Sequence, residues 1–359
     1  MRIALVSDCY LPRLGGIELQ VHDLAVQLVR AGHAVTVFTT TDGSSAAGDV
    51  PVVRLPSLAG IPLPAAIDTL RHALDSFDVV HAHTSLFSPL SWQAARHAVA
   101  PIITMHSLPN ASMPWPMAQI DRYIGPAKWT AVSGVVAERL RRSLPNGSVD
   151  VLHNGVDPDR WRQLRRPGHP LTIVSTMRLT RRKRPIALLR ALARIREIVP
   201  AGTAVRAMVV GGGPQARAVA AEARGLGLMS WVDLPGRLTR FEIQQLYATA
   251  DIYLAPAELE SFGVAALEAR CAGLPVIAMA SGGVGEFIRH GVEGYLVDND
   301  AQMAEAAAAL LTSPALLSRM QDHNYTTDPA MTWGHVVARH VAAYRTQVSL
   351  SALPLASAS

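Results

Sequence analysis

The sequence predicts an α/β protein built from two doubly wound domains that face each other across a cleft. Its 359 residues exceed the usual size of one domain, and 49% of them are hydrophobic. Short apolar runs alternate with amphipathic segments, which is typical of parallel sheets covered by helices. The alternation breaks at a polar stretch with arginine and proline, 158–170, and then restarts. We therefore predict a linker there, and ligand binding at the carboxyl ends of the strands.

The first domain is predicted to span residues 1–165. After its first strand, Ile17–Ala31 has apolar residues at helical spacing, and Gly32 stands where a C-terminal cap is expected. Short apolar runs predict strands at Arg2–Ser7, Ala34–Thr39, Asp78–His81, Pro101–Met105, Trp129–Val132 and Val149–Leu152.

The second domain is predicted to span residues 166–330. Thr239 and Glu242 match a capping box and predict a helix start. Strands are expected at Leu171–Thr176, Ala204–Val210, Ile252–Ala255, Val276–Ala278 and Tyr295–Val297. The segment 331–350, with a helix at Trp333–Ser349, is predicted to pack back on the first domain, and 351–359 is predicted to be a disordered tail.

Composition and charge exclude several classes of protein. No apolar run reaches the roughly 18 residues of a membrane span, and the N-terminal run leads into Asp8 as a strand does, not a signal peptide. Cys9 and Cys271 are too few for a disulfide framework, which favours a reducing, cytoplasmic location. The net charge of +5 suits an anionic ligand, or peripheral contact with the inner face of an anionic membrane. Nucleic acid is not expected, because no basic run carries interleaved aromatic residues.

Two acidic residues stand eight positions apart, Glu260 in a predicted loop and Glu268 inside the helix that begins near Gly263. At this separation the carboxylates would reach different parts of one elongated ligand. The backbone N–H groups of Phe262 and Gly263, next to Ser261, lie at a helix start, where anions and hydroxyl-rich groups are held. A ligand with a diol at one end and a sugar at the other suits this layout.

Three loops that follow predicted strands have residues suited to phosphate. Gly15 and Gly16 open a helix, so the backbone can approach an anion closely, although a simple tight turn explains them equally. Arg178 and Lys183, one of only two lysines in the chain, could neutralise a diphosphate; the alternative is a solvated surface. Gly212 lies in the run 211–213 and could lie against a nucleotide or merely turn the chain.

A metal site is a weaker interpretation. His81, His83 and His106 could suggest zinc, but no cysteine or paired acid completes a site, and core or rim histidines are the alternative. Two D-x-D patterns, 157–159 and 298–300, could hold a metal diphosphate, but Asp and Asn are expected in such turns anyway. We predict no metal. The segment 113–129 mixes aromatic and basic residues and could rest on a membrane or line an acceptor site, or simply pack.

In this order, these segments resemble the retaining glycosyltransferases of family 4, which have the GT-B fold of two facing Rossmann-like domains. The resemblance runs from Gly15 to about Asp300, nearly the whole chain. Its most specific part is Pro256–Gly263 (PAELESFG), Glu268–Ala269, Gly273–Val276 and Gly282–Glu286. Supporting matches are Val79–His83, Val132–Ser133, His153–Asp157, Arg178–Leu179 with Lys183, and Gly211–Pro214. Segments 6–12, 15–18 and 104–108 are also similar to the catalytic subunit that moves N-acetylglucosamine onto phosphatidylinositol.

The resemblance implies transfer of a hexose or N-acetylhexosamine from a nucleotide-diphosphate sugar to an acceptor hydroxyl, with retention at the anomeric carbon and without a metal or other cofactor. The acceptor would be a small molecule or a lipid. The implied catalytic residues are His106, Arg178, Lys183 and Glu260. The implied donor-binding residues are Gly15, Gly16, Arg178, Lys183, Gly212, Glu260, Ser261, Phe262, Gly263 and Glu268, of which Glu268 would bind the ribose.

Three positions depart from the family pattern: Arg184 stands where a glycine commonly follows the lysine, and Arg270 and Cys271 stand where small apolar residues are usual. Two other functions are compatible with the residues: a sugar-nucleotide epimerase, or a non-catalytic partner subunit that binds a sugar nucleotide. The base, the sugar and the acceptor stay open at this stage.

Overall fold

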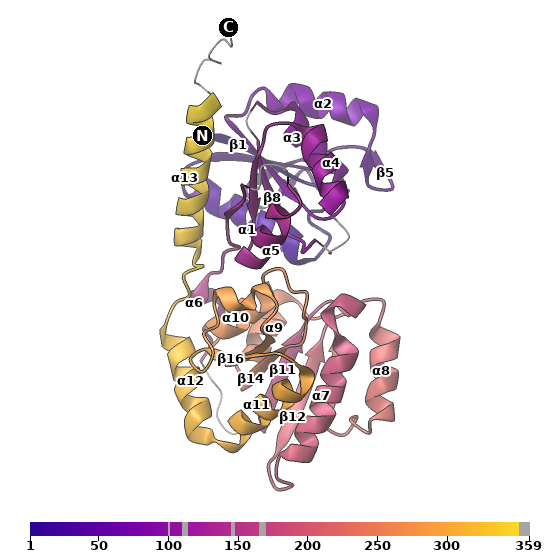
Figure 1. The fold of residues 1–359 in the computed structure, drawn as a ribbon, viewed down its shortest axis with the longest axis vertical. Coiled ribbons are helices and arrows are strands. Elements are labelled where there is room, and N and C mark those ends of the chain that lie inside the picture. The colour runs from indigo at the N-terminus through magenta and orange to yellow at the C-terminus, as the bar shows by residue number, and fades with distance from the viewer. Residues whose placement is uncertain (100, 110–113, 145–147, 165–169, 352–359) are drawn as a thin grey trace. The chain divides into compact units, whose positions relative to one another are not determined.

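The computed structural model describes residues 1–99, 101–109, 114–144, 148–164 and 170–351 (Figure 1). Contacts divide the chain into two compact units: unit 1 contains Met1–Gly155 and the chain from Trp333 onward, and unit 2 contains Val156–Thr332. The sequence predicts these divisions at 165/166 and 330/331. The chain enters and leaves unit 2 side by side, because Val156 N–H donates to the carbonyl of Met331 at 2.9 Å. The predicted tail lies outside the described residues, apart from Ser351.

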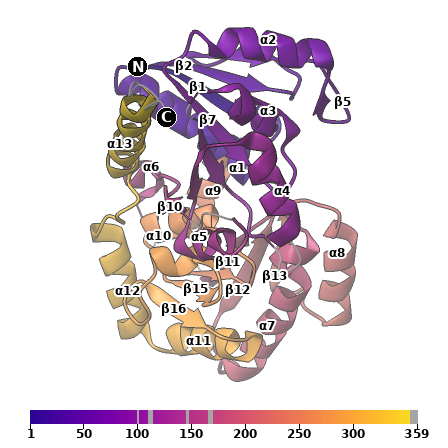
Figure 2. The same cartoon turned by 45° about the horizontal axis from the view of Figure 1, so that its top comes forward.

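Unit 1 is built on a sheet in the order β10-β9-β8-β7-β1-β2-β4-β3. Only β3 runs antiparallel to its neighbour, and β1 lies between β2 and β7 (Figure 2). The chain therefore reverses its direction of winding at β1 and β7. The strands are β1 (Arg2–Ser7), β2 (Ala34–Thr39), β3 (Ala46–Ala47), β4 (Val50–Arg54), β7 (Val79–Thr84), β8 (Ile102–Met105), β9 (Lys128–Ala131) and β10 (Asp150–Val151).

Helices cover both faces of this sheet. Val80 faces a core that includes Leu70 and Leu90, from the helices on one side, while its neighbour His81 reaches the helix on the other side and hydrogen bonds with Tyr344. Successive side chains of a strand point to opposite faces of the sheet, so β7 is buried on both faces. The helices are α1 (Gly16–Arg30), α2 (Pro64–Leu74), α3 (Pro89–His97), α4 (Pro114–Ile124), α5 (Gly134–Arg141) and α13 (Trp333–Ser351). A short hairpin, β5 (Ser57–Leu58) and β6 (Ile61–Pro62), precedes α2.

Unit 2 has a six-stranded parallel sheet in the order β13-β12-β11-β14-β15-β16. The winding reverses between β11 and β14. The strands are β11 (Leu171–Thr176), β12 (Val205–Val210), β13 (Val232–Gly236), β14 (Ile252–Ala255), β15 (Val276–Met279) and β16 (Gly294–Val297). The helices are α6 (Pro158–Trp161), α7 (Pro185–Ile198), α8 (Ala216–Gly225), α9 (Arg240–Tyr247), α10 (Val264–Cys271), α11 (Asp300–Thr312) and α12 (Pro314–Thr326).

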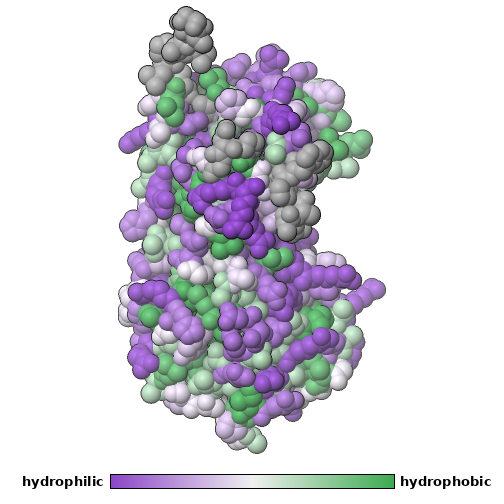
Figure 3. Space-filling model, viewed as in Figure 1, coloured by the Kyte–Doolittle hydropathy of each residue, from purple (hydrophilic) through white to green (hydrophobic). Residues whose placement is uncertain are grey.

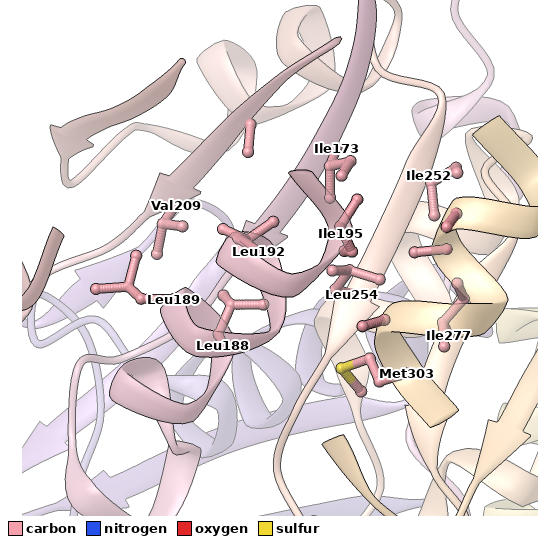
Figure 4. Close-up of a cluster of buried hydrophobic side chains, with 14 of the residues drawn as sticks. Ile173, Leu188, Leu189, Leu192, Ile195, Val209, Ile252, Leu254, Ile277 and Met303 are labelled. Carbon is pink, nitrogen blue, oxygen red and sulfur yellow. The ribbon is translucent and has the colours of Figure 1, made fainter. Parts of the chain in front are cut away.

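The core of unit 2 lies between the sheet and α7, α8 and α11. Figure 4 shows Leu188 and Leu192 of α7 facing Ile173 and Leu254 of the sheet, with Met303 of α11 beside them. On the other face, aromatic rings of Trp161, Tyr247 and Tyr253 pack together. The segment 158–161, predicted as linker, therefore belongs to a packed unit, because Trp161 is only 1% exposed.

Most predicted strands are confirmed to within a residue or two, as is the Thr239 capping box. β13 was missed because Pro235 and Gly236 discourage a strand. A proline is tolerated there because β13 is an edge strand of its sheet.

Candidate functional site

The point where the winding of unit 2 reverses brings two predicted loops together. β11 and β14 are neighbours and parallel, so the loops after both strands leave the same edge of the sheet. The first contains Arg178 and Lys183, and the second contains Glu260. A crevice at such a reversal point is the usual ligand site of open α/β sheets.

Lys183 and Glu260 form an ion pair at this edge. Their side chains are 23% and 15% exposed, so solvent screens the pair only in part. The guanidinium of Arg182 also donates to the carbonyl of Leu259, at 3.4 Å. The sheet topology thus unites a cation and an acid that are 77 residues apart in the sequence.

Arg184 explains the departure from the family pattern. Its backbone is left-handed, with φ 54° and ψ 44°, the conformation that glycine adopts most easily. Its guanidinium donates to both carboxylate oxygens of Asp300, at 2.9 and 2.8 Å, and to the carbonyl of Pro256, at 2.9 Å. It also pairs with Glu258, at 3.1 Å. The arginine therefore keeps the glycine-like turn and joins it to the loop that contains Glu260.

The glycine loop after β12 lies directly on the segment that contains Arg178. A Cβ at Gly211 would lie 1.8 Å from the carbonyl oxygen of Met177, and one at Gly213 would lie 2.4 Å from that of Leu179. Both glycines have positive φ, and the amide of Leu179 donates to the carbonyl of Gly212 at 3.0 Å. Only glycine permits this approach. Arg178 is exposed and makes no ion pair within the part of the chain that the structure describes.

The helix that contains Glu268 begins where the sequence predicted. Gly263 is its N-cap, with φ 94°, and a Cβ there would meet Val284 at 2.8 Å. Gly283 donates its N–H to the carbonyl of Glu260 at 2.9 Å, and its Cα leaves no room for a side chain against Ser261. Phe262 is 2% exposed and packs on Phe287, so its side chain anchors this loop in the core.

Glu268 has a partner that the sequence analysis did not identify. Arg240, the first residue of α9, places Nη2 3.1 Å from Glu268 Oε1, and its guanidinium lies 5.6 Å from the centre of the Trp161 ring. Both charged side chains are mostly buried, at 22% and 13% exposed. A basic residue directly after the Thr239 cap was visible in the sequence, but nothing in the sequence linked it to a helix 28 positions away.

In unit 1, His106 follows β8 and belongs to a cluster of imidazoles. His83 Nδ1 lies 3.0 Å from His106 Nε2, and His81 bonds to Thr104 and to Tyr344. Burial lowers the pKa of His106 to about 3 and that of His340, on α13, to about 4. It also holds the pKa values of His81 and His83 well below the usual range. These rings are neutral at physiological pH.

A small, open pocket adjoins this cluster within unit 1. Polar residues from five parts of the unit line it, among them Gln20, His83, His106, Asn154 and His340. His83 Nε2 is buried and has no hydrogen-bond partner among the described residues. Nowhere in the described ranges do three His, Cys, Asp or Glu side chains gather as metal ligands.

In the glycine pair of unit 1, a carboxylate lies directly against Gly15, whereas Gly16 is open. A Cβ at Gly15 would lie 2.3 Å from Glu18 Oε2, and Glu18 is buried and paired with Arg13 at 3.0 Å. The negative charge near the start of α1 suits the helix dipole. Phosphate binding by Gly15 and Gly16 therefore stays a prediction.

Comparison with known proteins shows to which protein family the chain belongs. The family model of glycosyl transferases group 1 matches residues 158–327, and that of Glycosyltransferase Family 4 matches residues 14–160. A GDP-mannose-dependent alpha-(1-6)-phosphatidylinositol monomannoside mannosyltransferase of Mycobacterium tuberculosis is 30% identical in an alignment of length 345 that covers 86% of this chain and 89% of that protein. The chain belongs to the glycosyltransferases. A D-inositol 3-phosphate glycosyltransferase of Thermobifida fusca is 26% identical, over 92% and 88% of the two chains.

Solved structures show that this glycosyltransferase has the GT-B fold, in agreement with the prediction. The Anabaena protein HepE, in complex with UDP and glucose, superposes with a TM-score of 0.79 over 96% of this chain and all of that one, at 17% identity. Sucrose-phosphate synthase from Thermosynechococcus elongatus superposes with a TM-score of 0.75 over 97% of this chain and 99% of that one, at 19% identity. The two Rossmann-like halves are the two units described above.

Other candidate groups of the glycosyltransferase have structural roles. In the D-x-D pattern 298–300, Asn299 caps α11 and Asp300 pairs with Arg184. In the segment 113–129, Met117 and Trp129 are buried, so these apolar side chains pack in unit 1. No helix among the described residues is long and apolar enough to cross a membrane.

Two residues of α10 that differ from the family pattern belong to the core of unit 2. Burial raises the pKa of the Cys271 thiol to about 12, so it is unreactive. Arg270 is 3% exposed, lies 3.6 Å from Glu293 and donates to the carbonyl of Thr327 at 3.3 Å. It therefore ties α10 to the chain that follows α12.

Proposed function

We propose that this glycosyltransferase moves a hexose from a nucleotide-diphosphate sugar to an acceptor hydroxyl, with retention at the anomeric carbon and without a metal. The observation that carries the proposal is the ion pair of Lys183 and Glu260 at the reversal point of the unit 2 sheet. Arg178 lies in the same loop as Lys183, and the glycine loop at 211–213 packs on the residues next to Arg178. This grouping offers cations for a diphosphate beside an acid for sugar hydroxyls.

The hard step is departure of the diphosphate. The bond between the anomeric carbon and the diphosphate oxygen breaks, the acceptor oxygen takes its place, and the acceptor proton leaves with the nucleoside diphosphate. Negative charge grows on the leaving oxygen, and we assign its stabilisation to Lys183 and Arg178. On donor binding, the diphosphate would share Lys183, while Glu260 would accept hydrogen bonds from the sugar.

Unit 1 would supply the contacts to the transferred sugar and the acceptor. His106 is assigned to a sugar hydroxyl, because a neutral imidazole can both donate and accept a hydrogen bond. Its hydrogen bond with His83 fixes the ring, and the adjoining polar pocket is assigned to the acceptor. The pocket's hydrogen-bonding side chains, among them Gln20, His106 and Asn154, suit a polyol.

The relatives narrow the first substrates to test. One is GDP-mannose-dependent and acts on a phosphatidylinositol monomannoside, and another acts on D-inositol 3-phosphate. We propose an inositol-containing acceptor, lipid or phosphate ester, in keeping also with the short resemblance to the subunit that glycosylates phosphatidylinositol. GDP-mannose, UDP-glucose and UDP-N-acetylglucosamine are the donors of choice.

The test is a matrix of these donors against inositol phosphate and phosphatidylinositol acceptors, with the product read by mass and by NMR. A product with the donor's anomeric configuration supports the proposal, and an inverted product contradicts retention. Interconversion of the donor sugar without transfer would identify an epimerase instead. Binding of nucleotide without turnover on every acceptor would identify a non-catalytic subunit. Undiminished rates after chelation of divalent cations are expected, and loss with recovery by one cation would refute metal independence.

We also propose peripheral contact with an anionic membrane through the β5–β6 hairpin of unit 1. Leu58, Ile61 and Leu63 are 74%, 53% and 41% exposed within six residues. Hydrophobic side chains gather at the edge of unit 1 where β5 lies (Figure 3). Exposed apolar side chains are suited to the boundary of a bilayer, and the net charge of +5 of the whole chain favours one with anionic lipid. The protein would then meet a lipid acceptor from the cytoplasmic side.

Vesicle co-sedimentation tests this contact. The intact protein should bind vesicles that contain anionic lipid, less so at high salt, and a Leu58→Ser, Ile61→Ser variant should lose most of the binding. Met229→Ser, which removes a 52% exposed apolar residue from unit 2, is the matched control and should bind normally. Equal binding by all three proteins, or no binding at low salt, would exclude the hairpin contact.

A further inference from the structure

We propose that Arg240 is a positioning residue for Glu268, and that the two residues form with Trp161 a preformed support for the donor ribose. This inference rests on the proposed function, because it takes Glu268 as the group that binds the nucleoside. It adds a residue that neither the sequence motifs nor the family resemblance assigns. Three contacts in unit 2 carry it.

The first contact is the ion pair itself. Arg240 Nη2 lies 3.1 Å from Glu268 Oε1, and both side chains are mostly shielded from solvent. Screening by water and salt is weaker for such a pair than for one at the surface. The pair joins α9 to α10, so the Glu268 carboxylate is held from outside its own helix.

The second contact fixes Arg240 in turn. Its guanidinium lies 5.6 Å from the centre of the Trp161 ring, and the Trp161 and Tyr247 rings lie 5.7 Å apart. Trp161 and Tyr247 are 1% and 0% exposed. A planar guanidinium is suited to such a position, because one face can stack on an aromatic ring while its edge donates to a carboxylate.

The third contact ties this support to the predicted diphosphate loop. Arg240 directly follows the Thr239 capping box, which fixes the start of α9. Just before it, the carbonyl of Gly236 accepts a 2.7 Å hydrogen bond from the N–H of Gly211. The loop at 211–213 in turn lies on the segment of Arg178. The ribose support and the diphosphate loop are therefore connected through the end of β13.

The chemistry assigns separate roles to the two charged groups. A ribose diol presents two O–H donors, and a carboxylate accepts through two oxygens with about four lone-pair positions. Arg240 has no acceptor atom, so it cannot replace Glu268. Its contribution is to order Glu268 before the donor arrives, which removes an entropic cost from binding. Loss of Arg240 should therefore weaken recognition of the ribose hydroxyls specifically.

The experiment compares nucleoside diphosphates with their 2′-deoxy analogues by calorimetry on the full chain. GDP and dGDP, and UDP and dUDP, are measured with the unaltered protein and with Arg240→Gln. The unaltered protein should prefer the ribonucleotide by about tenfold or more, as a hydrogen bond to a charged group implies. In Arg240→Gln this preference should fall to within about threefold.

A double-mutant cycle separates positioning from general damage. Glu268→Gln should lose the same preference, and the variant with both changes should be no worse than Glu268→Gln alone. Arg190→Gln is the matched control: it breaks the 2.8 Å pair with Glu222 between α7 and α8, and it should keep the full preference. Arg240→Lys keeps the charge without the planar fork, so its preference for the ribonucleotide should lie between those of the unaltered protein and Arg240→Gln. It provides the test if Arg240→Gln does not fold.

The outcomes distinguish the inference from the function on which it rests. If the unaltered protein prefers ribose and Arg240→Gln keeps that preference, the positioning role is refuted and the transferase function stands. The same conclusion follows if the effects of Arg240→Gln and Glu268→Gln on binding are additive in the double variant. Binding of nucleotide without any ribose preference in the unaltered protein would refute the role of Glu268 as well. Absence of any nucleotide binding would overturn the proposed function itself.

Discussion

Lys183 and Glu260 form an ion pair that joins the loop after β11 to the loop after β14. If this pair receives the diphosphate and the sugar, Lys183→Ala should lower kcat/KM by about 100- to 1,000-fold, as loss of one charge-stabilising donor does. Steady-state kinetics with the best donor and acceptor check this. Arg181→Ala is the matched control, because Arg181 is exposed in the same turn, and it should stay within about threefold. Equal losses in the two variants would contradict the assignment.

Two variants of Arg184 separate the cost of its left-handed backbone from the contribution of its side-chain contacts. Arg184→Ala removes the fork to Asp300 but keeps a side chain in a left-handed position, whereas Arg184→Gly removes both the contacts and the strain. Arg184→Gly should therefore be more stable than Arg184→Ala by about 1 kcal/mol. Urea unfolding of the two variants measures the difference. An Ala variant as stable as the Gly variant would show that the turn has rearranged.

The histidine cluster of unit 1 should make the protein sensitive to acid. Burial lowers the pKa values of His81, His83, His106 and His340 in the folded state, whereas the unfolded chain takes up protons near pH 6.5. The unfolded state therefore binds more protons below that pH, and stability falls as pH drops from about 6.5 toward 4, by up to about 1.4 kcal/mol per pH unit for each histidine.

Thermal unfolding of unit 1 between pH 7.5 and 4.5 measures this loss. His340→Gln removes one titrating ring, so its stability should depend less steeply on pH than that of the unaltered protein. His72→Gln, an exposed histidine of α2, is the control and should leave the slope unchanged. Identical slopes in the two variants would show that His340 does not contribute.

Glu293 should be a major source of stability in unit 2. Burial alone would raise the pKa of this carboxyl, but hydrogen bonds from Arg289 and His323 and the charge of Arg270 lower it to about 2. Glu293→Gln leaves Arg270 buried without its charge partner, which should cost about 3–5 kcal/mol. Chemical unfolding checks this, with the 58% exposed Glu305→Gln as a control expected to change stability by about 0.5 kcal/mol or less.

The contribution of Glu293 to the free energy of unfolding should disappear at low pH. Because the folded pKa of Glu293 is below its unfolded value near 4.5, its contribution is present above pH 4.5 and is lost as pH falls toward 2. Glu293→Gln should remove this part of the acid dependence. An unchanged stability profile between pH 4.5 and 2 would contradict the role of Glu293.

The sequence predicted the fold class because period and composition act locally. Apolar runs such as Leu171–Thr176 and Ile252–Ala255 became strands with the predicted bounds, since strands of a parallel sheet that are buried on both faces are rich in apolar residues. The helix start near Gly263 and the capping box at Thr239 were predictable for the same reason: each depends on residues within one turn.

Only the tertiary structure decided which of these local features meet. The sequence provided Glu260, Lys183, Glu268 and the loop of Gly212, but the sheet order brings Lys183 to Glu260 and seats the glycine loop on the Arg178 segment. The pairing of Arg240 with Glu268, and of Arg184 with Asp300, depends on the packing of helices that are distant in the chain. Ion pairs between distant residues leave no periodic pattern in the sequence. The sequence by itself therefore determined the helices, the strands and the candidate site residues. The packing of elements distant in the chain determined which charged residues pair.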